Sequence, residues 1–209
     1  MPAYKYVDDL KAEFDLRRGA IRRRLREFSA VKPEEYFYEL VYCLLTPQSS
    51  AVNAAKAVDV LRRKDVLSND IPAGPLLHQK GFYIRFHHTK GRHIAEAKVR
   101  FPDILAQLMN GASPFQMREW LVNNVKGLGL KEASHLLRNI GHRNLAILDR
   151  HILRNLKKHG VLRTLPKSLT SKQYLRIEQR FLRFAEQVGI SMDELDLLFW
   201  SRETGEILK

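Results

Sequence analysis

Apolar residues recur three and four positions apart along almost the whole chain, and this spacing limits the fold more than any other feature. One such face follows Pro33, a residue suited to the first turn of a helix. The positions with this spacing are Phe37, Leu40, Val41, Leu44 and Leu45; Val52, Ala55, Val58 and Leu61; Ile94, Ala97 and Phe101; Tyr174, Ile177, Phe181, Phe184 and Val188; and Leu195, Leu198 and Phe199. We find no run of alternating apolar residues bounded by hairpin turns, which is the pattern of a strand. The sequence therefore predicts an all-α fold.

Proline and glycine predict where these helices end. Pro102 is expected to interrupt the helix that contains Ile94, and Gly189 to end the long helix after Val188. Loops are expected at 68–75 and 163–170, which both contain proline.

The charge balance bears on the partner. The chain has 209 residues, 36 of them lysine or arginine and 23 acidic, a formal net charge of +13. This excess favours a polyanion, either nucleic acid or an anionic membrane surface, although charge alone also fits a merely basic protein. Six arginines lie between Arg17 and Arg26. They can contact phosphates or form a solvated helix face.

Several classes of protein are excluded or disfavoured. No run of 18 apolar residues is present, so no membrane span is expected. The first five residues have no apolar signal core, and we expect a cytoplasmic protein associated with the nucleoid. Cys43 is the only cysteine, which excludes a disulfide framework and four-cysteine zinc or iron–sulfur sites. His87, His88 and His93 lack the partners of a metal site, so no metal is predicted.

The most informative stretch predicts two helices joined by a glycine turn. Leu121, Val122 and Val125 form one apolar face, and a second face follows Lys131. Between them lies Gly127-Leu128-Gly129, whose glycines permit a tight turn and a close backbone approach to a ligand. Backbone N–H groups at such a turn and at the next helix start can hold a phosphate. By itself, Gly-x-Gly also fits an ordinary helical hairpin.

A later helix is expected to begin at Asp149. Its side chain suits an N-cap, and Leu148 and Leu153 are spaced to form a hydrophobic staple around it. Local pattern alone favours no more than a capping role for this aspartate.

The spacing of these residues resembles the helix-hairpin-helix superfamily of DNA glycosylases. Asp149 follows Lys131 by 18 residues, and His151 lies two residues further on. The resemblance implies that Lys131 is the nucleophile and Asp149 the second catalytic residue. It also implies that Gly127, Gly129 and His151 contact the DNA backbone.

Further motifs narrow the resemblance to type 2 8-oxoguanine glycosylases. Leu44-Leu45-Thr46-Pro47-Gln48-Ser49 is similar to a motif whose glutamine or asparagine enters the gap left by the flipped base, a role implied here for Gln48. The chain ending, from Asp196 through Trp200 to Lys209, is also similar to that group. The resemblance implies that Asp196, Trp200 and Lys209 help to bind the damaged base. Core packing for Trp200 and a frayed terminus for Lys209 are the alternatives.

Arg85 and Phe86 lie in a loop-like stretch and are candidates to contact the base opposite the lesion, unless the aromatic residues are buried. The resemblance implies two helical lobes, one at 33–140 with its hairpin at about 117–140, the other combining 1–32 and 141–209. Lys131 and Asp149 would then face each other across the cleft between the lobes.

These residues define an expected reaction on damaged double-stranded DNA. The enzyme would flip out 8-oxoguanine, let Lys131 attack C1′ to form a Schiff base, and cleave the abasic strand by β-elimination. Asp149 would stabilise positive charge developing on the sugar and assist the proton transfers. We expect a monomer, the default for an enzyme that must clamp DNA, and no required cofactor. The single cysteine excludes a four-cysteine iron–sulfur cluster, and the resemblance implies that the hairpin can hold a monovalent cation.

Two alternatives compete with this interpretation. A non-catalytic helix-hairpin-helix module would bind DNA through phosphates but would not need the pair Lys131 and Asp149. A glycosylase of the same fold could act on another lesion. The single cysteine disfavours the members with a four-cysteine cluster, and Lys131 disfavours the alkylation-repair members, which lack the hairpin lysine. A membrane-surface protein fits poorly because the basic segments lack a wide apolar face.

Overall fold

The computed structural model describes residues 4–207, and the predicted all-α class is confirmed. The chain forms two compact units. Met1–Ala30 together with Leu137–Lys209 make one, which we call the terminal unit, and Val31–Leu136 make the other, which we call the middle unit. The sequence-based lobe boundaries at 33 and 140 stay a prediction.

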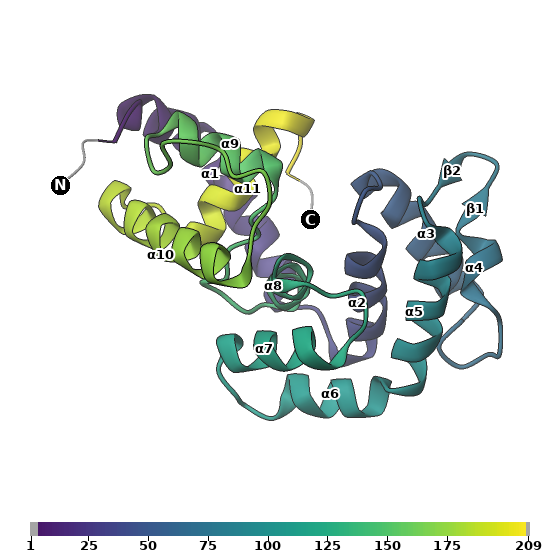
Figure 1. Ribbon diagram of the computed structural model, residues 1–209. Helices are drawn as coiled ribbons and strands as arrows, with labels where there is room; N and C mark the ends of the chain where they lie inside the picture. Colours follow the sequence, from purple (N-terminus) through teal and green to yellow (C-terminus); the bar gives the residue numbers. More distant parts are fainter. Residues whose placement is uncertain (1–3, 208–209) are drawn as a thin grey trace. The chain divides into compact units, whose positions relative to one another are not determined.

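The middle unit is built around one almost fully buried helix, α2 (Tyr36–Leu45), which follows a 3-10 turn at Pro33–Glu35. Every residue of α2 after Tyr36 is buried, because α3 and α5 pack against it (Figure 1). The other elements are α3 (Ala51–Arg63), α4 (Ala73–Leu76), β1 (His78–Gln79), β2 (Phe82–Tyr83), α5 (His87–Val99), α6 (Phe101–Met109) and α7 (Pro114–Asn124).

The small antiparallel sheet formed by β1 and β2 was not predicted. His78 pairs with Tyr83 and Gln79 with Phe82, and Gly81 permits the turn between them through its positive φ of 105°. Strands of two residues are too short to show an alternating pattern in the sequence.

The prediction that Pro102 interrupts a helix was wrong in detail. Ile94 and Ala97 lie on α5, which ends at Val99, and Phe101 begins α6 with Pro102 in its first turn. Proline is tolerated there because the first helical N–H groups have no intrahelical acceptor. The expected interruption is therefore present but lies at Arg100, and Pro102 belongs to the first turn of the second helix.

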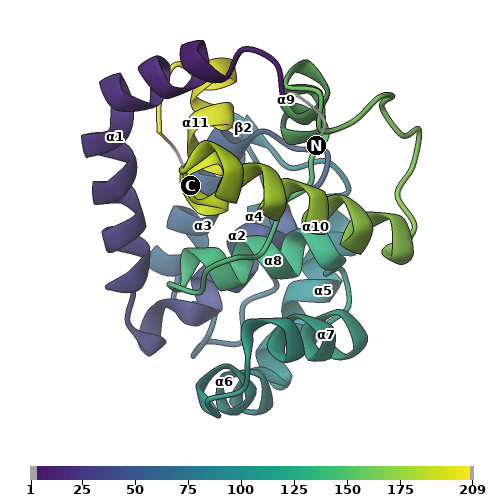
Figure 2. The same ribbon diagram turned by 90° about the vertical axis from the view of Figure 1, so that its left-hand side faces the viewer.

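The terminal unit packs α11 (Met192–Thr204) against α1 (Val7–Ser29), α9 (Arg150–Lys158) and α10 (Ser171–Val188) (Figure 2). Gly189 ends α10 in the left-handed conformation, as predicted. The arginine-rich segment lies within α1, a helix whose inner face the sequence reading had not identified. That face consists of Leu10, Phe14, Ile21, Leu25 and Phe28.

One further helix, α8 (Leu130–Asn139), contributes to both units, since the division falls between Leu136 and Leu137. Its first turn carries Lys131, and its last turn carries Arg138.

Candidate active site

The predicted glycine turn lies between α7 and α8 in the middle unit. Gly127 has a φ of 89°, and a β-carbon there would lie 2.5 Å from Nδ1 of His93 and 3.0 Å from Cδ2 of Leu44. The turn therefore packs directly on α5 and α2 through the absence of a side chain. Only glycine meets both the conformational and the steric requirement.

Lys131 lies in the first turn of α8, directly after the glycine turn. Its side chain is 30% exposed, and its Nζ lies 3.1 Å from Oε1 of Glu132. Oε2 of the same glutamate accepts a 3.3 Å hydrogen bond from the N–H of Gly129. Glu132, which the sequence reading did not single out, thus contacts both the predicted nucleophile and the turn.

The segments that carry Gln48 and Arg85 are joined in the middle unit. Gln48 is exposed and adopts a φ of 56°, and the hydroxyl of Ser49 accepts a 3.1 Å hydrogen bond from the N–H of Arg85. Phe86 is exposed, with the Arg85 guanidinium 4.9 Å from the centre of its ring. Both side chains are therefore accessible, and the alternative of a buried Phe86 is excluded.

Lys90 is a buried residue of this region that the sequence reading missed. Its Nζ donates to the carbonyls of Leu45 and Pro47, and burial lowers its pKa to about 8, with Lys131 acting in the same direction and Glu132 opposing. No local pattern could have identified Lys90, because its acceptors lie more than 40 positions away in the chain.

Asp149 caps α9 in the terminal unit, as predicted. Its carboxylate accepts hydrogen bonds from the N–H groups of His151 at 2.8 Å and Ile152 at 2.9 Å. Nδ1 of His151 lies 3.1 Å from a carboxylate oxygen of Glu203, and its ring centre lies 5.1 Å from that of Trp200. The start of α9 is thus placed next to α11.

The remaining candidates for base recognition differ in their surroundings. Trp200 is half-buried on α11. Asp196 is buried and paired with Arg138 at 2.8 Å. Burial raises the pKa of Asp196 to about 7, a shift that Arg138 opposes and Asp149 reinforces. Lys209 lies outside the described residues, so its predicted role is not addressed by the structure.

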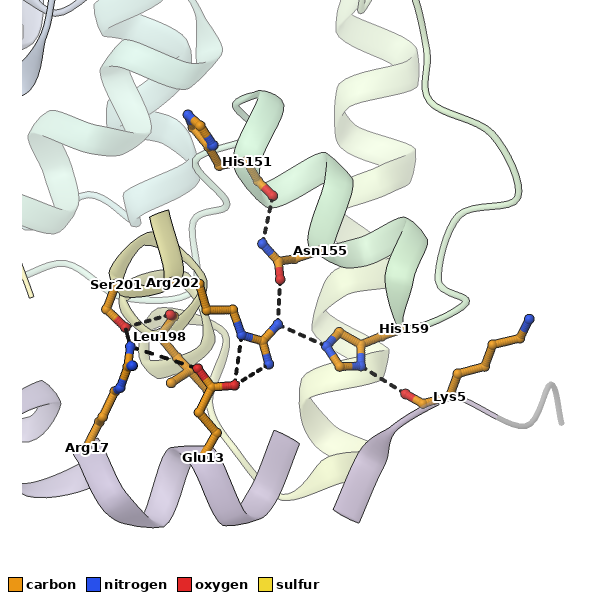
Figure 3. A network of polar contacts seen from close by, with 9 residues as sticks. All are labelled: Lys5, Glu13, Arg17, His151, Asn155, His159, Leu198, Ser201 and Arg202. Atoms are coloured by element: carbon orange, nitrogen blue, oxygen red, sulfur yellow. Dashed lines mark hydrogen bonds and ion pairs between the residues drawn. The ribbon is translucent and has the colours of Figure 1, made fainter. Parts of the chain in front are cut away.

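A polar network holds the helices that carry these residues (Figure 3). Arg202 of α11 donates to the side chains of Glu13 on α1 and Asn155 on α9, and lies 3.2 Å from Nε2 of His159. Asn155 in turn donates to the carbonyl of His151 at 3.0 Å. The first turn of α9, which Asp149 caps, is therefore connected to α11 through one guanidinium.

The two residues expected to do the chemistry belong to different units. Lys131 lies in the middle unit with Gln48, Arg85 and Phe86, whereas Asp149 lies in the terminal unit. Their predicted meeting across a cleft stays a prediction.

Neither a metal centre nor a membrane span is indicated within residues 4–207. No group of three or more His, Cys, Asp or Glu side chains is placed to hold a metal ion there. No helix in this part of the chain is long and apolar enough to cross a bilayer. The predicted binding of a monovalent cation at the turn stays untested.

Comparison with known proteins gives consistent matches. A family model described as 8-oxoguanine DNA glycosylase matches residues 21–190. The 8-oxoguanine DNA glycosylase/AP lyase of Fusobacterium nucleatum is 38% identical over the full length of both chains. That of Korarchaeum cryptofilum is 39% identical over 97% of this chain and 99% of its own.

Solved structures agree in fold. The 8-oxoguanine DNA glycosylase of Thermotoga maritima superposes with a TM-score of 0.85 at 31% identity, covering 97% of this chain and 98% of that one. The Methanocaldococcus jannaschii 8-oxoguanine glycosylase/lyase, solved with a 15mer DNA containing 8-oxoguanine, gives a TM-score of 0.85 at 32% identity. That match covers 96% of this chain and 99% of the other.

Proposed function

Because this chain belongs to the 8-oxoguanine DNA glycosylase family, we infer that it excises 8-oxoguanine from DNA and then cleaves the abasic strand as an AP lyase. The family match over residues 21–190 is the observation that carries this conclusion. The roles of individual residues below are our proposals, supported by the local geometry.

Excision begins by rotating the damaged nucleotide out of the helix, which costs a few kcal/mol of stacking and pairing. Gln48, exposed in the loop between α2 and α3, enters the gap that the nucleotide leaves, while Arg85 and Phe86 contact the opposite base. The turn at Gly127 holds the DNA backbone through its N–H groups, helped by the net positive charge of the chain.

Lys131 then attacks C1′ of the flipped nucleotide in its neutral form. Its Nζ forms a bond to C1′ and loses a proton, while the glycosidic bond breaks and its electron pair leaves with the base. Opening of the sugar gives the Schiff base. Asp149 stabilises the positive charge that develops on the sugar and assists the proton transfers.

The imine also supplies the lyase activity. It makes the C2′ proton acidic, and loss of that proton breaks the C3′–O bond, so that the 3′ phosphate leaves. No step needs a redox centre or an activated water on a metal, and we propose that the enzyme works without a cofactor and as a monomer of 24.3 kDa. Activity in excess EDTA and light scattering in solution test these two points.

Borohydride trapping tests the nucleophile and the lesion together. Wild type and Lys131→Gln are incubated with a duplex carrying one 8-oxoguanine, and covalent complexes are resolved on a denaturing gel. Lys126→Gln is the matched control, because this lysine lies on the same turn with an exposed side chain that pairs with Glu96 at 3.2 Å. Wild type and Lys126→Gln should trap, and Lys131→Gln should lose excision by on the order of 10³-fold or more.

Each other outcome has a defined meaning. Trapping by Lys131→Gln at the wild-type level would assign the nucleophile to another amine. Trapping of wild type only on a different lesion would keep the mechanism and overturn the substrate. If wild type binds the duplex but neither traps nor excises, the chain acts only as a DNA-binding module.

A further inference from the structure

Lys90 is a buried charge on α5 whose hydrogen bonds are all used. The residue is only 5% exposed. Nζ donates to the carbonyl of Leu45 at 2.7 Å, to the carbonyl of Pro47 at 2.6 Å and to the hydroxyl of Ser49 at 3.3 Å. An ammonium has three donors, so these three oxygens satisfy it fully. Burying a cation is costly, which raises the question of what this lysine does there.

Two of these acceptors lie on either side of Gln48. Pro47 and Ser49 are its chain neighbours, and both are held by the same ammonium. Gln48 itself is exposed and takes a φ of 56°, a left-handed conformation that costs energy for a residue with a β-carbon. Lys90 therefore fixes, from the buried side of the loop, the backbone on either side of Gln48, which is exposed and strained.

The same lysine connects this loop to the segment that carries Arg85 and Phe86. Phe86, the N-cap of α5, has a left-handed φ of 59° and accepts the backbone N–H of Lys90 at 2.9 Å, a helix bond that does not depend on the lysine side chain. The Ser49 hydroxyl that accepts from Lys90 also accepts from the N–H of Arg85. The Lys90 ammonium and the Ser49 hydroxyl thus hold together two loops that lie 36 positions apart in the sequence.

We propose that Lys90 is a positioning residue for base flipping. It holds Gln48 where this side chain enters the gap left by the flipped base, and it holds Arg85 and Phe86 where they contact the base on the opposite strand. This inference rests on the proposed function, since it assigns a role within the excision of 8-oxoguanine. Lys90 touches neither the base nor the sugar in this scheme. It acts on the step before the attack by Lys131.

The protonation of Lys90 agrees with this role. Burial, together with the nearby charge of Lys131, lowers its pKa to about 8, and Glu132 opposes the shift. Near neutral pH the amine is thus mostly protonated and donates all three hydrogen bonds. The carbonyl of Leu45 lies at the C-terminal end of α2, where a positive charge is also favoured by the helix dipole.

The test compares Lys90→Met with Lys90→Arg and with Lys98→Met. Lys98 is the matched control because it lies two turns further along α5 and donates to the carbonyl of Asn69, at 2.6 Å, away from both loops. Three quantities are measured at pH 7. They are the single-turnover excision of 8-oxoguanine, the borohydride trapping on a preformed abasic site, and the fluorescence of 2-aminopurine placed next to the lesion, which reports unstacking.

Lys90→Met should slow excision at least tenfold and lose most of the 2-aminopurine signal. Trapping on the abasic duplex should change by less than threefold, because that nucleotide has no base to flip. Lys90→Arg, which keeps the charge and the donors, should recover part of the excision rate, and Lys98→Met should match wild type. Equal losses on both substrates, or excision within twofold of wild type, would overturn the proposal.

Ser49→Ala provides a second variant in case Lys90→Met does not fold. It removes only the hydroxyl shared between Lys90 and Arg85. We expect the same selective loss of excision and fluorescence with a smaller amplitude, and wild-type values in both measurements would contradict the role of this contact. If wild type itself excises no 8-oxoguanine but traps on abasic DNA, the proposed substrate fails. The variants are then compared by the fluorescence signal at the lesion that wild type does excise.

Discussion

Asp149 accepts a hydrogen bond from the N–H of His151, and the same oxygen, Oδ1, also accepts the N–H of Ile152. The cap and the proposed catalytic charge therefore belong to one carboxylate but are separable. Asp149→Asn keeps an oxygen that can cap the helix and removes the charge. We expect its unfolding free energy to stay within about 0.5 kcal/mol of wild type, while excision falls on the order of 10²-fold.

The control for capping is Thr170→Ala, which removes the side-chain cap of α10. It should cost about 1 kcal/mol of stability and leave excision unchanged. Asp149→Ala should show both losses. If Asp149→Asn excises 8-oxoguanine at the wild-type rate, this aspartate is only a helix cap.

Gly127 offers a test of the turn. Alanine at this position must adopt a φ of 89° and place its β-carbon 2.5 Å from Nδ1 of His93. Gly111→Ala is the matched control, because Gly111 has a φ of 76° but no atom within 4 Å of the added carbon. Both variants suffer backbone strain of about 1–3 kcal/mol, and Gly127→Ala should lose at least about 1 kcal/mol more through overpacking. Urea unfolding measures both.

The same pair separates stability from DNA affinity. Gly127→Ala should also weaken binding to an abasic duplex severalfold, since the turn would shift away from α5, whereas Gly111→Ala should bind as wild type does. Equal affinities for the two variants would show that the turn does not position the DNA.

Local features of this chain were predictable because their causes are local. The cap at Asp149, the end of α10 at Gly189 and the turn at Gly127 each depend on residues a few positions apart, so the sequence pattern indicates them directly. The apolar faces of α2 and α10 follow from a period that any buried helix must show.

What the sequence could not indicate are contacts between distant segments. The acceptors of Lys90 lie 41 to 45 positions away, and Arg202 reaches Glu13 across 189 positions. A charged side chain in a helix is usually solvated, so nothing in the sequence marks Lys90 as buried or Arg202 as the centre of a polar network. The charge run in α1 is a related case, because Arg22 pairs with Glu194 of α11 rather than being free for DNA.

Arg138 and Asp196 form a buried ion pair. Experiment can decide whether this pair only stabilises the fold or also helps to bind the damaged base. The two side chains are 4% and 6% exposed and lie 2.8 Å apart. Asp196→Ala leaves the guanidinium buried without its carboxylate and should cost about 3–5 kcal/mol. The double variant Arg138→Met with Asp196→Leu removes both charges and should recover most of that loss. Urea unfolding measures the free energies.

The folded double variant then tests the predicted contact of Asp196 with the damaged base. If excision of 8-oxoguanine survives within about threefold, Asp196 serves only to hold α8 against α11. If the variant is as stable as wild type but has lost excision, the carboxylate takes part in recognition, as the sequence resemblance implied.

His159 predicts a pH dependence of stability. Nε2 of its buried ring lies 3.2 Å from Nη1 of Arg202, and Nδ1 lies 2.9 Å from the carbonyl oxygen of Lys5. Arginine can only donate, so Nε2 accepts and Nδ1 carries the proton of a neutral ring. Burial lowers the pKa of His159, with Arg202 and Lys158 adding to the shift, while the carbonyl of Lys5 and the carboxylate of Glu13 oppose it.

The direction of this pH dependence follows from the pKa of His159 in the folded and in the unfolded chain. An unfolded histidine takes up a proton near pH 6.5, whereas the folded ring takes it up only at lower pH, so the unfolded chain binds more protons in that window. The unfolding free energy of wild type should therefore fall as the pH drops through 6.5, with a slope from this group of at most about 1.4 kcal/mol per pH unit. His159→Gln keeps a neutral donor and acceptor and lacks this term. Urea unfolding of both proteins from pH 7.5 to 5.0 should show their difference in stability narrowing toward acid, and parallel curves would mean that His159 is protonated equally in both states.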